Sequence, residues 1–219
     1  MSTNMNSAIT RNNRGIVFLE KGLHEHALIE FKTAAQLMYT FTQELKKRHR
    51  DKAGSPNKPL ESFTECIPSE RSIMTGNSFI CSTPIIMLGS DEPSSSCTIE
   101  SASILLNMAL CYHLNSMRSN PMEGVLQNAI NLYAMSYDLA IQVHEDSRSQ
   151  KIIMTALNNL GQLNYEIGEY EASQLHLNDL SMYINFLGEK VERSCLGDLH
   201  ECMLNAMILR NQHHSAAAA

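Results

Sequence analysis

Four asparagines recur at one position of the helical sequence pattern, and their side chains could bind a peptide main chain. Asn13, Asn107 and Asn159 each stand two residues before a small residue, and Asn205 lies in a similar Leu-Asn setting. An asparagine amide carries both a donor and an acceptor, so it can pair with an extended main chain without reading the side chains. The alternative interpretation is that these residues cap turns or face solvent. We take the four asparagines as the candidate peptide-binding residues.

Other reactive side chains lack the spacing that catalysis or metal binding requires. His24 and His26 are two residues apart at the start of a helical pattern, which places them on different faces. The group of Cys195, Asp198, His200 and Cys202 has ligand types without zinc spacing. The sequence has no Gly-rich phosphate loop, Gly-x-Ser-x-Gly or His-Glu-x-x-His motif. We therefore expect no enzyme, no catalytic residue, no cofactor and no metal, with an unrecognised catalytic site as the weakest alternative.

Composition favours a helical protein that does not bind nucleic acid. The 219 residues include 13 Met and no Trp, and glycine and proline are few, which favours helices and an all-α fold. The formal charge of −6 argues against a nucleic-acid surface, because phosphate binding needs clustered cations. The basic run at 46–50 is interpreted as the solvated end of a helix, with a nuclear-import signal or an acidic partner as alternatives.

Cysteine usage and the N-terminal sequence indicate the compartment. Six cysteines are scattered without C-x-x-C pairs, which fits reduced thiols inside the cell. Residues 1–13 are polar and do not resemble a secretory signal, and no apolar run approaches the ~18 residues of a membrane span. We expect a cytoplasmic or nuclear protein that is not secreted and has no membrane partner.

Helical periodicity divides the chain into pairs of helices around an insertion. A flexible tail at 1–8 precedes a first helix pair at 9–48, in which Gly22 separates the two helices. Residues 49–98 hold most of the prolines and show no helical period, so we expect a largely disordered insertion. The second and third pairs occupy 99–190, a capping helix 191–212, and a flexible tail 213–219.

One part of the insertion is too apolar for a solvated linker. Residues 78–88 are rich in aliphatic and β-branched side chains, and Pro84 prevents them from forming an interior strand. An extended segment docked on a surface fits this composition better.

A short pattern of small and bulky residues repeats along the three helix pairs. Each first helix carries a small residue followed by an aromatic, and each second helix a small residue followed four positions later by a bulky one. The pattern comprises Gly15, Phe18, Ala27 and Phe31; Ala109, Tyr112, Ala129 and Tyr133; and Gly161, Tyr165, Ser173 and Leu177. Small residues at these positions would let two helices cross closely while the bulky residues fill the space beside them.

This pattern resembles the tetratricopeptide repeat, and the overlong second helices are most similar to the repeats of kinesin light chains. The resemblance implies a right-handed α-solenoid whose concave groove holds an extended peptide or a partner helix, with the asparagines hydrogen-bonding the peptide main chain. The clamp that holds chaperone C-termini in this family would need other residues at Asn12, Ile16, Asn158 and Gln162, which excludes that specialisation.

The function expected from the sequence is a non-catalytic adaptor or scaffold that binds a protein or peptide partner. A stronger hypothesis places residues 79–88 in the groove as an internal occupant. The main alternative is a structural helical protein that self-associates, and the sequence does not give the oligomeric state.

Overall fold

The computed structural model describes residues 3–51, 73–75, 78–87, 94–117 and 124–187, together with residues 204, 207 and 208. Six α-helices and one short 3-10 helix make up most of this part of the chain, which confirms the expected helical fold. The helices are α1 (Thr3–Glu20), α2 (His24–Asp51), α3 (Ser94–Ser116), α4 (Val125–Ala140), η1 (Ile141–Val143), α5 (Ser147–Glu166) and α6 (Tyr170–Leu187). A small antiparallel hairpin of β1 (Ile73–Thr75) and β2 (Ser78–Ile80) is the exception.

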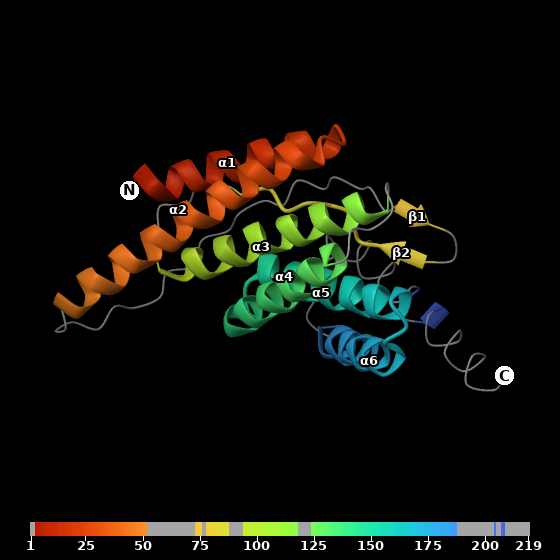
Figure 1. Cartoon of the computed structure of the whole chain (residues 1–219). Coiled ribbons are helices and arrows are strands. Elements are labelled where there is room, and N and C mark those ends of the chain that lie inside the picture. The colour runs from red at the N-terminus through yellow and green to blue at the C-terminus, as the bar shows by residue number, and fades with distance from the viewer. Residues whose placement is uncertain are drawn as a thin grey trace.

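The helices form three pairs that follow one another along the molecule (Figure 1). Helix α1 packs on α2, α3 on α4 and α5 on α6, and the pairs are joined by contacts of α2 with α3 and of α4 with α5. The first helices of successive pairs, α1, α3 and α5, also contact one another in that order. The core is therefore built mainly between helices that are neighbours in the sequence.

The small residues of the repeat mark places where two helices cross closely. A Cβ atom added to Gly15 would lie 2.6 Å from Cε1 of Phe31, and one added to Gly161 would lie 2.7 Å from Cδ2 of Leu177. These distances are shorter than two carbon atoms tolerate, so a Cβ at either position would force the facing side chain to move. In the third pair the Ser173 hydroxyl also donates to the Gly161 carbonyl at 2.7 Å.

The turns inside the first and third pairs pass through glycines with left-handed backbone. Gly22 has φ of 72° and Gly168 has φ of 84°, a region that residues with a Cβ rarely occupy. Backbone hydrogen bonds close each turn, including the one from Leu23 N to Phe18 O at 2.9 Å. Glycine at these two sites lets each chain reverse within a few residues.

Two expected boundaries differ from the structure. Helix α1 begins at Thr3, so the expected tail at 1–8 is wrong for residues 3–8. Met5 and Ala8 are buried against α2, and this burial stabilises the first turns of the helix. Helix α2 continues to Asp51 and α3 begins at Ser94, where Cys97 packs into the same core, so the insertion is shorter than 49–98. The rest of the insertion, most of the expected capping helix at 191–212 and the tail at 213–219 lie outside the described residues.

Candidate functional site

Residues 80–87, which we call the inserted segment, cross the first helices of all three pairs. The segment leaves the β1–β2 hairpin beside α5 and then runs as an extended chain past α3 to α1 (Figure 1, yellow). Its main chain meets one asparagine on each of these helices. We call Asn13, Asn107 and Asn159 the asparagine ladder.

Each asparagine of the ladder forms two hydrogen bonds with a single residue of the inserted segment. The Oδ1 atom accepts from the backbone N–H of that residue, and Nδ2 donates to its backbone carbonyl. The three pairs are Asn13 with Met87 (3.0 Å to Oδ1 and 2.8 Å from Nδ2), Asn107 with Ile85 (2.8 and 2.9 Å), and Asn159 with Cys81 (3.0 and 3.1 Å).

This pairing reproduces with side chains what a neighbouring β-strand does with its backbone. In an extended chain the N–H and C=O of one residue point to the same side, so a single amide can satisfy both. Pro84, which has no N–H, stands between the residues held by Asn159 and Asn107. The hydrogen bonds of the ladder therefore involve only main-chain atoms of the inserted segment.

The direction of the inserted segment is opposite to the order of the helix pairs. Passing from Cys81 to Met87, the chain meets α5 first, then α3 and finally α1. The paired residues are separated by four positions and then by two. A ligand that bound in the same way would run antiparallel to the repeats.

Two further asparagines support the ladder from the side. Asn12 donates to Asn13 Oδ1 at 3.2 Å and to the Ile85 carbonyl at 3.3 Å, while its own Oδ1 accepts from Asn107 Nδ2 at 3.0 Å. Asn158 donates to Asn159 Oδ1 at 3.1 Å. Both are completely buried. Sequence reasoning missed them as site residues, although the repeated Asn-Asn doublets were a visible signal.

A buried polar chain extends from the ladder into the helix bundle. Asn159 Nδ2 donates to the Tyr133 hydroxyl at 3.0 Å, and this hydroxyl lies 3.4 Å from Nδ1 of His113. Burial raises the pKa of Tyr133 above its usual range, so the phenol stays neutral and can donate to the imidazole.

The polar chain ends at a carboxylate near the end of α5. Nε2 of His113 lies 3.9 Å from Glu166, whose other carboxylate oxygen accepts from Gln162 at 2.7 Å. Burial alone would raise the pKa of Glu166, but the hydrogen bond from Gln162 and the neighbouring imidazole of His113 hold it below its usual value. The side chain of Asn159 is therefore held by Tyr133, which is followed in turn by His113 and Glu166.

Aliphatic side chains of the inserted segment fill the core on both sides of the ladder. Ile80 is completely buried, Ile85 is 8% exposed and Met87 is 1% exposed, whereas Ile86 between them is 43% exposed. Each buried residue belongs to a different hydrophobic cluster. Ile80 packs with Ile16, Leu19, Phe31 and Leu110; Ile85 with Ile99, Leu106, Leu157 and Leu160; and Met87 with Met5, Ile9, Met38 and Phe41.

Of the four candidate asparagines, the structure brings three together on one segment. Asn205 and the Cys195–Cys202 group lie outside the described residues. His24 is buried, and His26 instead stacks obliquely on Phe18, with 5.5 Å between ring centroids. Within the described ranges, no group of three or more His, Cys, Asp or Glu could hold a metal ion. In the same ranges no helix is long and apolar enough to cross a membrane.

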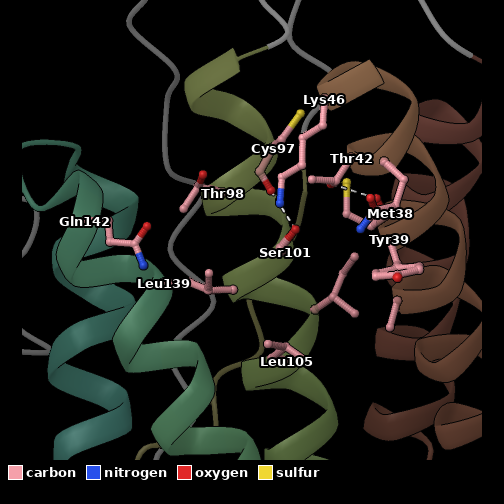
Figure 2. A pocket seen from close by; sticks show the side chains of 13 residues that line it. Met38, Tyr39, Thr42, Lys46, Cys97, Thr98, Ser101, Leu105, Leu139 and Gln142 are labelled. Carbon is pink, nitrogen blue, oxygen red and sulfur yellow. Dashed lines mark hydrogen bonds between the residues drawn. The ribbon is translucent and has the colours of Figure 1, made fainter. Parts of the chain in front are cut away.

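A pocket of about 470 Å³ lies between α2, α3 and the end of α4, away from the ladder (Figure 2). Its lining combines apolar side chains such as Ile104 and Leu139 with polar ones such as Lys46 and Gln142. Two of its hydroxyls bond within their own helices: Thr42 donates to Met38 O and Ser101 to Cys97 O. Neither the ladder nor the inserted segment contributes to it.

Comparison with known proteins gives no relative from which a function could be transferred. No protein-family model matches the chain, and no curated protein or solved structure matches it either. The site is therefore interpreted from its own geometry.

Proposed function

We propose that the protein is a non-catalytic peptide-binding module, an adaptor or scaffold that holds an extended segment of a partner across α1, α3 and α5. The observation that carries this proposal is the set of three two-point hydrogen-bonded pairs between the asparagine ladder and a main chain. Such pairs suit peptide recognition, because they supply affinity through the backbone and leave specificity to the side chains.

Three observations support an arrangement of the tetratricopeptide type, which we propose as the finer description of the fold. The helices pack consecutively as pairs, close crossings occur at the small residues of the repeat, and the asparagines share one face of the first helices. In this interpretation the inserted segment is an internal occupant of the binding face, and partner binding requires its release.

A released form of the full chain tests the proposal. The double substitution Ile85→Asp and Met87→Asp places charges where the clusters are apolar, so the segment should leave the ladder. A fluorescent synthetic peptide of residues 78–88 should then bind, as measured by fluorescence polarisation. Adding Asn13→Ala, Asn107→Ala and Asn159→Ala to the same variant should abolish binding.

Circular dichroism establishes that each variant keeps its helical content, and Ile85→Ser with Met87→Ser replaces the aspartates if they unfold the chain. The proposal fails if a helical, released variant does not bind the peptide, or if binding is indifferent to the three asparagines.

Self-association is the second candidate function, favoured by the outer face of α6. Leu175, Met182 and Phe186 are 64%, 70% and 57% exposed, and their spacing of seven and four residues places them on one side of the helix. A row of large apolar side chains is typical of a contact surface. Light scattering over a concentration series would show a rising mass for the native chain and a constant monomer mass for Met182→Asp with Phe186→Asp. A native chain that stays monomeric would exclude this function.

A further inference from the structure

The inserted segment shows which side chains a partner must carry, an inference that rests on the proposed peptide-binding function. The ladder accepts any extended main chain. When a partner displaces the segment, however, the side chains of Ile80, Ile85 and Met87 leave the core and their sites become empty. Empty apolar cavities are unfavourable, because their lining loses both dispersion contacts and shielding from water. A ligand must therefore refill them.

The spacing of the buried residues defines the ligand pattern. Counting from Ile80 as position i, the large aliphatic residues Ile85 and Met87 fall at i+5 and i+7, and the small Ser82, 7% exposed, falls at i+2. A regular strand would bury every second residue. The step of three from Ser82 to Ile85 therefore interrupts the alternation of buried and exposed residues at Thr83 and Pro84. This shift makes the pattern distinct from that of an ordinary amphipathic strand.

We propose that the partner is an extended segment of another protein with large aliphatic residues at i, i+5 and i+7 and a small residue at i+2. It runs antiparallel to the order of the helix pairs, as the chain's own segment does. The exposed position i+6, occupied here by Ile86, carries no requirement.

The chain's own segment competes with such a partner. Six residues separate Met87 from Ser94 at the start of α3, so after release Met87 stays within roughly 25 Å of the start of that helix. A short tether of this kind gives a local concentration on the order of millimolar. The native chain should therefore bind an external peptide more weakly than the released variant does.

Peptides of residues 78–88 with single substitutions test the pattern on the released full-length variant. Ile80→Ser, Ile85→Ser and Met87→Ser in the peptide should each weaken binding about tenfold to a hundredfold, because each removes one buried side chain. Ile86→Ser is the matched control and should change affinity less than about threefold. A peptide of the same residues in reverse order should bind at least tenfold more weakly, since its pattern no longer meets the three cavities.

The outcomes separate this inference from the proposed function. If all peptides bind equally well and the three asparagine substitutions still abolish binding, the peptide-binding function holds and the side-chain pattern is wrong. An equal loss for Ile85→Ser and Ile86→Ser would also overturn the pattern. If no peptide binds the helical, released variant, the proposed function itself fails.

Discussion

At the scale of single residues, the amide of asparagine explains why this side chain recurs on three helices. A buried asparagine amide needs partners for its acceptor Oδ1 and for both N–H groups of Nδ2. The main chain of a single extended residue pairs with Oδ1 and with one of these N–H groups. Asn107 uses its second N–H on Asn12, and Asn159 uses its second on Tyr133. Glutamine would reach too far and aspartate would lack the donor.

Substituting Asn107 by aspartate tests this balance. The change keeps the shape but turns Nδ2 into an oxygen that faces the carbonyl of Ile85 and Oδ1 of Asn12. We expect the free energy of unfolding to fall by at least about 1–3 kcal/mol, measured by urea denaturation, and the Ile85 amide to exchange faster with deuterium. Asn131→Asp on the exposed side of α4 is the control. Unchanged exchange at Ile85 would contradict the role of Asn107.

The carboxylate of Glu166 gives the acid dependence of the polar chain a definite sign. Its pKa is held below the ordinary value of 4.5, so its ionised form stabilises the folded state above about pH 4.5, and this contribution is lost as the pH falls through the lower, folded pKa. Melting temperatures of the native chain and of Glu166→Gln should therefore differ most near pH 6 and converge near pH 3. A difference that does not depend on pH would show that ionisation is not involved.

At the scale of helices, the pairs depend on close crossings at glycine. Gly15→Ala would place a Cβ against the ring of Phe31. Overpacking of this kind is expected to lower the free energy of unfolding by about 1–3 kcal/mol, measured by urea denaturation. In a chain that already carries Phe31→Leu, the Gly15→Ala substitution should lower the free energy of unfolding by less than it does in the native chain. An alanine at position 15 without any loss would mean that the crossing can widen freely.

Successive pairs are also joined by an ion pair in the interior. Nη1 of Arg148 on α5 lies 2.9 Å from Oε1 of Glu100 on α3, and their side chains are 16% and 1% exposed. Arg148→Met should lower the free energy of unfolding by about 3–5 kcal/mol, because the carboxylate loses its cation inside the protein.

Two variants serve as controls for this ion pair. Arg11→Met should lose less than about 1 kcal/mol, since Arg11 is 44% exposed and Arg14 remains beside Glu30. Adding Glu100→Gln to Arg148→Met should restore stability. Equal losses for the Arg148 and Arg11 variants would show that burial does not strengthen the internal pair.

At the scale of the whole molecule, the proposed exchange of the inserted segment for a partner requires that its release cost less free energy than unfolding of the helices. Native-state hydrogen exchange measures both quantities. We expect the amides of Cys81, Ile85 and Met87 to exchange through an opening of lower free energy than that of the buried α5 amides Leu157 and Leu163. Identical free energies would mean that the segment leaves only when the chain unfolds, which contradicts exchange with a partner.

The helices themselves were predictable from the sequence because their signals are local. Periodic apolar residues, glycine turns and small residues at fixed spacing act within one pair, and the structure forms helices and close crossings where these patterns indicate. The start of α1 at Thr3 was not predictable, because Met5 becomes buried only when α2 is beside it. Asparagines 13, 107 and 159 were found because they share a repeat position, while Asn12 and Asn158 gained a role only from three-dimensional contacts.

The sequence by itself determined a set of helix pairs, an asparagine at the same repeat position in the first helix of each pair, and an apolar stretch in the insertion. Only the tertiary structure decided that these belong together: Asn159 meets Cys81 across 78 positions, Asn13 meets Met87 across 74, and Glu100 meets Arg148 across 48. Helical periodicity does not predict contacts between residues so far apart in the sequence. The register of the inserted segment depends on which cavities accept Ile80, Ile85 and Met87. Those cavities exist only after the helices have packed.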